Sequence, residues 1–492
     1  MAGRFLSIFK PIARIIPEIK SPERRVRFNE KLFWTALVLI IYLIMTEVPL
    51  YGVISTSLGE LAALRIIFAS NRGSLMELGI GPIVTAGLIL QLLVGSAMIE
   101  CDMGSSEDRG LFTTASKVFS ILLTGIQAFA YIIGGMYGTL PSSIALMVFL
   151  QLLAAGVIVM LLDELVQKGW GFGSGISLFI MAGVAQHIFW QSFSPVPGPG
   201  ESRAYGFFVA LGQVLSSGQP AALMWLRNHP APTTGTDLLT AIPSNPSMLG
   251  LVATIAAFLV IIYMEGVRVE LPLSYAGYRG YRSRYPIKLL YVSNLPVIFA
   301  SALFANVYFF SQLFWSMNGQ PTPGNNFWLD LLGQYTKVTS GNSTSIHPSG
   351  GLVYYVTAPN NFIDATSAPA RALGYLGILI VFCVVFSLTW LEVGGLGPST
   401  VAQQLIDSGM QIPGYRQSGR AIESVLKRYI PAVTVVGGIA VAMVAGISDF
   451  FGVFGSGMGI LLSVGIVYQY YETLVKEQAA ETIPAFRRIF GE

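Results

Sequence analysis

The 492-residue chain has few charged residues, and this scarcity indicates its class. Only 11% of its residues are Asp, Glu, Lys or Arg, whereas an ordinary soluble domain carries about 25%. Hydrophobic residues make up 53%. The 29 basic and 26 acidic residues nearly cancel to a net charge of +3, so only their positions along the chain are informative. This composition indicates a protein that lies within lipid.

Cysteine and histidine are also scarce, which excludes a disulfide framework and a His/Cys metal site. Of the two cysteines, Cys101 is expected near a membrane surface and Cys383 in the middle of an apolar helix, so they cannot pair. The three histidines are isolated, with no second His or Cys within a helical turn. We therefore expect no metal and no cofactor.

Ten apolar segments are long enough to cross a membrane, whose hydrocarbon core requires about 20 mainly apolar residues per helix. They lie at 32–51, 77–99, 117–137, 142–162, 173–192, 249–265, 289–315, 372–392, 430–447 and 452–472. We therefore predict an all-α membrane protein with ten transmembrane helices in two halves, 32–192 and 249–472. The first five-helix half starts on the cytoplasmic side and the second starts on the external side, and this arrangement predicts an inverted repeat. We find no residue-level similarity between the halves.

Basic residues are distributed unevenly between these segments. With the N-terminus in the cytoplasm, 23 of the 29 Lys and Arg fall on the cytoplasmic side. The positive-inside rule thus predicts that side for the tails and two large loops. These are 1–31, 473–492, 266–288 and 393–429.

The connections 193–248 and 316–371 then become external loops. They are rich in Pro, Gly, Ser, Thr and Asn, which predicts irregular structure with at most short surface helices. The second contains a glycosylation sequon at Asn342, for which a plain polar loop is an equally good interpretation.

The stretch between the first two apolar segments is neither a spanning helix nor a short turn. Residues 58–69 have helical periodicity but are too short to cross a bilayer. The stretch must be re-entrant or lie at the external interface. A re-entrant version implies a cavity, because irregular backbone at membrane depth occurs only where it lines one or is buried in protein.

Ionisable groups are almost absent between the ends of the second to tenth segments. Coupled transporters and proton pumps keep such groups in their spans, so this absence disfavours both classes. Glu47, at the outer end of the first segment, is expected at the interface. We find no hydrolytic pairing and no His-Glu-x-x-His pattern, and the glycine-rich runs 171–175 and 455–459 lack the Lys-Ser/Thr of a phosphate-binding loop.

The two large cytoplasmic loops carry the most informative charges. The first interleaves Arg279, Arg282 and Arg284 with tyrosines, and the second carries Arg416 and Arg420. Arginine beside aromatic rings suits a phosphate backbone and its bases. From composition alone, docking to a nucleic acid and an ordinary positive-inside excess are equally good interpretations.

Eight short motifs follow one another along nearly the whole chain. They are PERRV at 22–26, ASNRG at 69–73, GIGPIVT at 79–85, GSGISLF at 173–179, YPIK at 285–288, SNLP at 293–296, KRYIP at 427–431 and GSGMGILL at 455–462. Their types and order resemble the SecY family, including the eukaryotic translocon α subunits. Eight motifs in family order are far more specific than any single one. The pattern is closer to archaeal and eukaryotic members than to bacterial ones.

The resemblance implies a clamshell of two five-helix halves around a central hourglass pore. It implies a plug near 57–70 and a lateral gate between the second and seventh helices. It also implies a pore ring formed by Ile80, Val84, Ile176, Ile180, Ile298 and Leu462. The first two pairs are spaced i, i+4, which puts two branched apolar side chains on one helix face, although ordinary packing produces the same spacing.

Three polar residues match the gate positions of the family. They are Thr85, Gln127 and Asn306, expected on the second, third and seventh helices. Interhelical hydrogen bonds among such groups contribute about 0.6 to 2 kcal/mol each, enough to keep a seam closed and weak enough for a hydrophobic segment to open. A purely structural polar contact is the alternative.

The resemblance also implies partners and a location. Arg279 and Arg416 match loop arginines that meet the ribosome or another cytoplasmic partner, and Arg282, Arg284 and Arg420 are expected to act with them. The implied partners are a SecE-type gamma subunit, a small beta subunit, the ribosome with its rRNA, signal sequences, nascent polypeptides and membrane lipid. We expect an archaeal plasma membrane, with the endoplasmic reticulum as the alternative.

These features favour a passive protein-conducting channel. It would move secretory polypeptides across the membrane and release hydrophobic segments laterally into lipid, with energy from a ribosome or motor outside this chain. We do not expect an enzyme. A secondary solute transporter is the alternative from another class, and a structural membrane scaffold is the third.

Overall fold

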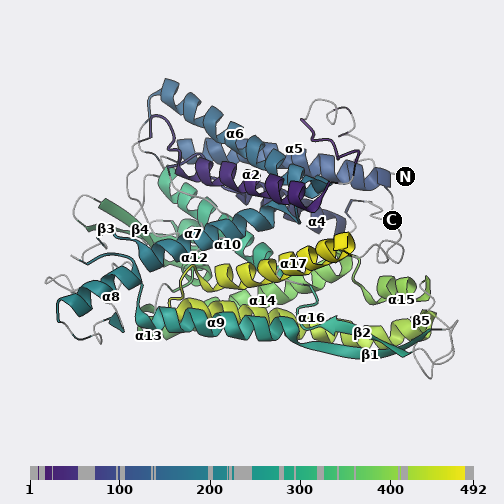
Figure 1. Cartoon of the computed structure of the whole chain (residues 1–492). Helices are drawn as coiled ribbons and strands as arrows, with labels where there is room; N and C mark the ends of the chain where they lie inside the picture. Colours follow the sequence, from purple (N-terminus) through teal and green to yellow (C-terminus); the bar gives the residue numbers. More distant parts are fainter. Residues whose placement is uncertain are drawn as a thin grey trace.

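The structure is a computed structural model of the chain, in which long helices lie side by side as one bundle (Figure 1). It describes residues 9, 11, 17–24, 26–53, 73–95, 98–99, 106–134, 137, 140–197, 203–218, 220, 224–225, 246–275, 282–292, 295–318, 326–340, 343–359, 362–407, 410–411 and 419–482. The predicted plug, 57–70, and Asn342 lie outside these residues.

Each predicted apolar segment overlaps one helix of the bundle. In the first half these are α2 Phe28–Glu47, α4 Gly81–Gly95, α5 Ser106–Ile133, α6 Ser142–Leu165 and α7 Gly175–Phe193. In the second half they are α9 Met248–Gly266, α10 Leu295–Met317, α14 Pro369–Val393, α16 Gly419–Phe450 and α17 Gly457–Thr482. Within the described residues, nine helices are long and apolar enough to cross a membrane, and α4 is a shorter apolar helix.

The second helix is shorter than its predicted range, 77–99. Residues 77–80 form turns, because Gly79 has a φ of 55°, a left-handed conformation that interrupts the helical repeat. The Glu77 carboxylate accepts a hydrogen bond from the backbone N–H of Gly73 within the same turn region. Pro82, which has no N–H to donate, then occupies the first turn of α4, where that donor is not needed. Ile80 is thereby presented from a buried turn rather than from a helix.

Both ends of the bundle carry β-structure. At one end, β1 Arg268–Tyr275 pairs antiparallel with β2 Arg282–Lys288, and β5 Met410–Gln411 pairs with the end of β1. We call this end, which also carries α15 Pro398–Asp407, the basic end (Figure 1).

The opposite end, which we call the far end, holds the two connections that were predicted to be irregular. That prediction was wrong for the second, where β3 Gln334–Ser340 and β4 Ser343–Gly350 form a hairpin. Thr, Tyr, Val and Ile in these strands favour extended structure, and this local preference outweighs the polar loop-like composition. In the described parts of these connections there are also four short helices: α8 Phe207–Ser216, α11 Phe327–Leu332, α12 Gly351–Val356 and α13 Phe362–Ser367.

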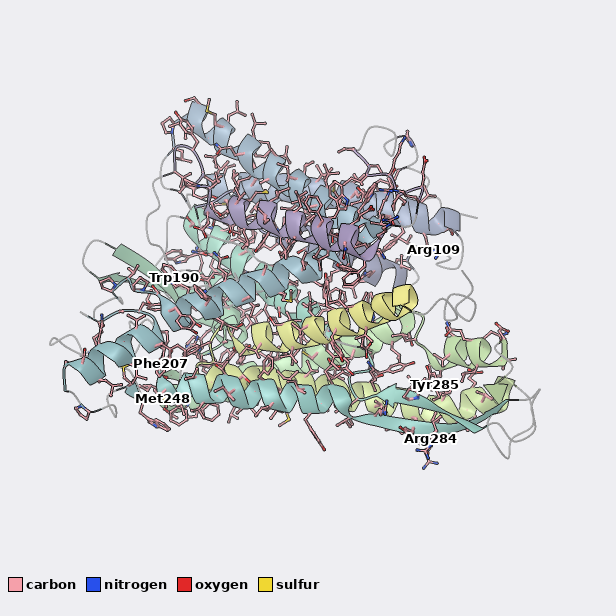
Figure 2. The ribbon with its side chains drawn as sticks, viewed as in Figure 1. Arg109, Trp190, Phe207, Met248, Arg284 and Tyr285 are labelled. Atoms are coloured by element: carbon pink, nitrogen blue, oxygen red, sulfur yellow. The ribbon has the colours of Figure 1, made fainter. Side chains whose placement is uncertain are left out.

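Labelled side chains mark the two ends of the bundle (Figure 2). Arg109, Arg284 and Tyr285 lie at the basic end, whereas Trp190 and Phe207 lie at the far end. Contacts join segments that the sequence assigned to one side of the membrane. For example, Lys288, the last residue of β2, forms an ion pair with Glu472 on α17 at 3.1 Å.

One hydrophobic cluster occupies the centre of the bundle and draws on every long helix except α5. Tyr42 of α2 stacks on Phe179 of α7 within it, with ring centroids 4.8 Å apart. A separate cluster at the basic end includes Ile287 of β2 and Leu426 of α16, both buried. The β1–β2 hairpin is therefore anchored by packing against α16.

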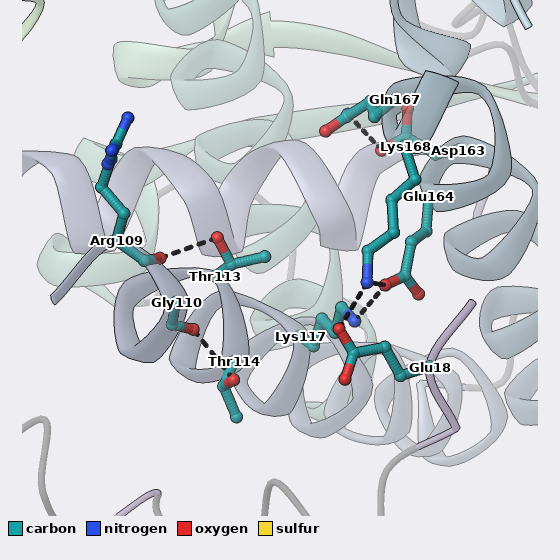
Figure 3. Close-up of polar contacts among 10 residues, drawn as sticks. All are labelled: Glu18, Arg109, Gly110, Thr113, Thr114, Lys117, Asp163, Glu164, Gln167 and Lys168. Atoms are coloured by element: carbon teal, nitrogen blue, oxygen red, sulfur yellow. Dashed lines mark hydrogen bonds and ion pairs between the residues drawn. The ribbon is translucent and has the colours of Figure 1, made fainter. Parts of the chain in front are cut away.

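A chain of ion pairs joins the N-terminal segment to α5 and α6 (Figure 3). The Lys117 ammonium lies 2.5 Å from the Glu164 carboxylate, which is only 7% exposed, and Lys168 lies 3.1 Å from it. Lys168 also pairs with Glu18 and, through that hydrogen bond, lowers the pKa of Glu18 below its usual value. A buried carboxylate is costly unless it is paired, and here two ammonium groups compensate for it. The Trp170 indole N–H adds a 2.9 Å hydrogen bond to the Lys20 carbonyl.

Candidate functional site

The six predicted ring residues come from four helices and one turn, and the fold brings them into one cluster. Ile80, Val84, Ile180 and Leu462 are buried members of the central cluster. Ile176 and Ile298 are partly buried and pack against it.

The chemistry of this group is uniformly apolar. None of the six side chains can donate or accept a hydrogen bond, so a narrow passage lined by them tends to exclude water and ions. Ile80, Ile180 and Leu462 have no exposed surface in this structure. The arrangement is therefore one in which apolar side chains fill the centre of the bundle.

A hydrogen bond crosses the contact between α4 and α10. The Asn306 amide nitrogen donates to the Thr85 hydroxyl at 3.2 Å and to the Ala302 carbonyl at 2.8 Å. The second bond lies within α10 and orients the amide toward α4. Gln127, the third predicted gate residue, is partly buried on α5, and in the described part of the chain its side chain has no hydrogen-bond partner. The structure thus joins Thr85 and Asn306 by a hydrogen bond, and within the described residues no hydrogen bond joins Gln127 to either of them.

The predicted docking arginines lie on the basic end as far as the structure describes them. Arg284 on β2 is 77% exposed and donates to Glu270 of β1 at 2.7 Å, a hydrogen bond that lowers the pKa of Glu270. Figure 2 shows Arg284 directed away from the ribbon. Arg282 is the first residue of β2 and Arg420 the second of α16. The other two predicted residues, Arg279 and Arg416, lie outside the described residues.

The two basic loops start from neighbouring strands. Tyr275, at the end of β1, pairs with Met410 of β5, and Ser274 pairs with Gln411. Tyr275 precedes Arg279 by four residues, and Gln411 precedes Arg416 by five residues. The fold therefore places the origins of both loops side by side.

Two buried carboxylates beside the ring were not singled out from the sequence. Asp163 and Asp449 are 7% and 6% exposed, and they lie in the last turns of α6 and α16. A signal was present, because each precedes a Gly-Ser-Gly motif, at 173–175 and at 455–457. The motif occurs once in each half, and this repetition is the signal by which the two acids could have been found.

Comparison with known proteins assigns almost the whole chain to one family. A sequence model of the SecY family matches residues 74–471, and a model of the plug domain of Sec61p matches residues 40–73. The chain belongs to the SecY family. It is a multi-pass membrane protein and forms a protein-conducting channel rather than a solute transporter. The family is a channel family, not a class of enzymes.

Solved structures of relatives share the fold. The chain is similar to a protein-conducting channel, with 35% identity over 96% of this chain and 98% of that one, at a TM-score of 0.76. It is similar to Sec61 in the canine ribosome-channel complex from the endoplasmic reticulum, with 34% identity over 96% and 98% of the two chains, at 0.74. A chain of the idle yeast Ssh1 complex bound to the yeast 80S ribosome is 25% identical over 95% and 94%, also at 0.74.

The Thr85–Asn306 hydrogen bond generates a prediction about the seam between α4 and α10. In a double-mutant cycle with Thr85→Val and Asn306→Leu, we expect a coupling of about 0.6 to 2 kcal/mol in the free energy of unfolding, measured in detergent. As a control, Ser316→Ala removes a different α10 bond, to the Gly134 carbonyl, 2.6 Å away. Thr85→Val and Ser316→Ala should be additive within about 0.5 kcal/mol. A coupling no larger than that of the control pair would show that the Thr85–Asn306 hydrogen bond does not stabilise the seam.

Proposed function

We propose that the chain is the central subunit of a channel through which secretory polypeptides cross the membrane, and from which hydrophobic segments leave sideways into lipid. The proposal rests on the apolar ring and on the adjacent seam between α4 and α10, which the hydrogen bond from Asn306 to Thr85 crosses. A channel for unfolded chains must open in two directions, across the membrane and toward lipid. The ring serves the first direction and the seam between α4 and α10 the second.

The ring suits a passage that must seal without binding its cargo. Branched apolar side chains pack against one another at rest, and they yield to a passing side chain because dispersion contacts are individually weak and non-directional. Polar groups at the same place would hydrate the passage and bind the moving chain. An apolar ring therefore serves both requirements.

The seam suits a gate that a hydrophobic segment can open. Separating Thr85 from Asn306 costs about 0.6 to 2 kcal/mol. Burying one leucine-sized side chain in an apolar environment returns about 1.5 to 3 kcal/mol, so a signal sequence with several such residues can offset that cost. A polar segment gains no such energy and stays in the pore. The weakness of the seam is thus what selects the exit route.

The ring assignment predicts a leak. Replacing Ile80, Ile176 and Ile298 together by Asn should admit water and ions to the resting channel, because each amide offers hydrogen-bond partners where none exist. The measurement is ion conductance of the reconstituted protein, with thermal stability recorded in parallel. Leu426→Ala, which leaves a cavity in the separate cluster at the basic end, is the matched control and should lower stability without raising conductance. A folded triple variant with wild-type conductance would place the pore axis elsewhere.

We also propose that the basic end faces the cytoplasm, in an archaeal plasma membrane, with the endoplasmic reticulum as the alternative. The excess of Lys and Arg on this side supports the orientation. In a background with Cys101 replaced by Ser, a cysteine at Ser399 on α15 should react with an impermeant thiol reagent only from the cytoplasm. A cysteine at Ser217, beside α8, should react only from outside. Both native serines are exposed. Labelling of Ser217→Cys from the cytoplasm would reverse the orientation.

A ribosome is the partner that we propose for the basic end. Two relatives were solved in complexes with ribosomes, and rRNA presents the phosphates that an exposed arginine fork binds. Arg284 supplies such a fork on β2, and the adjacent origins of the two loops support joint use of Arg279, Arg282, Arg416 and Arg420. A SecE-type gamma subunit and a small beta subunit complete the proposed assembly, which the family resemblance supports.

Docking to rRNA predicts a strong dependence on salt. Arg279→Glu with Arg416→Glu should weaken ribosome binding, and wild-type affinity should fall steeply with added salt, because salt reduces the free energy gained by releasing counterions. Reconstituted vesicles co-sedimented with ribosomes over a salt series provide the measurement. As a control, Arg371→Glu reverses a basic residue that packs on Tyr354 at the far end and should leave binding unchanged. Affinity indifferent to both salt and the loop changes would leave these arginines as topology signals only.

A further inference from the structure

The helices α7 and α17 begin in the same way, although they belong to opposite halves. Each starts at the second glycine of a Gly-Ser-Gly motif, Gly175 in α7 and Gly457 in α17. The first glycine of each motif has a left-handed φ, 68° at Gly173 and 78° at Gly455. Ile180 and Leu462 of the proposed ring each follow the helix start by five residues. The ring residue thus has the same position relative to the helix start in both halves.

The preceding helix approaches each start so closely that only glycine fits. A Cβ at Gly175 would lie 2.6 Å from the Cα of Asp163 on α6. A Cβ at Gly457 would overlap the carbonyl oxygen of Ala445 on α16 and lie 2.7 Å from the Cβ of Ser448. Because backbone atoms cannot move aside, each glycine allows the preceding helix to come within hydrogen-bonding reach of the helix start.

A buried carboxylate uses this close approach in both halves. Asp163 Oδ1 accepts from the Ile176 N–H at 2.9 Å, and Asp449 Oδ1 accepts from the Gly457 N–H at 2.6 Å. The first N–H groups of a helix have no partner within it, and its dipole favours negative charge at that end. The other carboxylate oxygens accept from the side chains of Gln167, at 2.8 Å, and Tyr375, at 3.1 Å. Both acids are thus fully hydrogen-bonded caps.

The two helices also bind each other's starting loops. Gln191, near the end of α7, accepts from the Gly455 N–H at 2.8 Å, just before α17. Tyr470 of α17 donates to the Phe172 and Ser174 carbonyls, at 3.0 and 3.2 Å, just before α7. The start of each helix is therefore held by the preceding helix and by the other helix of this pair.

We propose that Asp163 and Asp449 are positioning residues that set the depth and rotation of Ile180 and Leu462 in the pore ring. The inference rests on the ring proposed above. Five residues correspond to about 7.5 Å of helix rise, so the ring residue lies within two turns of the cap. Without the cap the first turn frays, and a change of one residue in register rotates the side chains that follow by about 100°. The seal then depends on two carboxylates that do not line it.

The test separates positioning from general stability. Asp163→Ala and Asp449→Ala remove the cap acceptors, whereas Asp163→Asn and Asp449→Asn keep an oxygen that can accept the same N–H. The matched controls are Leu152→Ala on α6 and Leu426→Ala on α16, which are buried in clusters away from the caps. Each reconstituted protein is assayed for resting ion conductance and for thermal stability.

Positioning predicts a rise in resting conductance of about fivefold in the alanine variants, the equilibrium change for losing one typical cap. The Asn variants should restore a wild-type seal, and the controls should lose stability without a leak. If the alanine variants fail to fold, Asp163→Leu and Asp449→Leu remove the acceptor while filling its volume. Folded variants that stay sealed would overturn the proposal. So would failure of every Ala and Leu form to fold, because the carboxylates would then serve folding alone.

The ring variants provide an independent reference for the same assay. If the Ile80, Ile176 and Ile298 triple variant leaks while folded cap variants stay sealed, the ring stands and the positioning role fails. If the triple variant also stays sealed, the ring assignment fails and the positioning role fails with it.

Discussion

The architecture depends on one constraint: a backbone polar group inside a membrane protein has no water to bind. The long helices satisfy their own N–H and C=O groups except in the first and last turns. At α7 and α17 the first turn packs closely against the preceding helix. There Asp163 and Asp449 replace the missing acceptors. The two buried acids, which a hydropathy profile marks as unfavourable, are thus a consequence of starting helices within the protein interior.

The same constraint explains where charge is tolerated. The most buried ion pair of the described residues, Lys117 with Glu164, lies where α5 and α6 meet the N-terminal segment, and Lys168 and Glu18 extend it. Two acids and two bases compensate one another there, so desolvation costs less than for an isolated charge. Arg284, by contrast, is largely exposed and free to meet a partner even while it pairs with Glu270.

The centre of the bundle combines strong non-directional packing with a weak directional bond. Apolar side chains from both halves meet in one cluster, and their contacts re-form after any displacement because they have no required geometry. The Asn306–Thr85 bond has a required geometry but a small energy. A channel that must seal, open and seal again needs both properties. In this chain they belong to different residues on adjoining helix surfaces.

The sequence by itself determined the class, the number of apolar helices and the family, because hydrophobic length and short motifs are local properties of the chain. It mispredicted the β3–β4 hairpin because composition was given more weight than the extended preference of Thr, Tyr, Val and Ile. Only the tertiary structure decided that Thr85 meets Asn306 while Gln127 does not, and that Asp163 and Asp449 cap the helices that follow. Those contacts depend on how far one helix start lies from another helix in space. That distance is set by the packing of all the helices together, and it has no signature in any single segment.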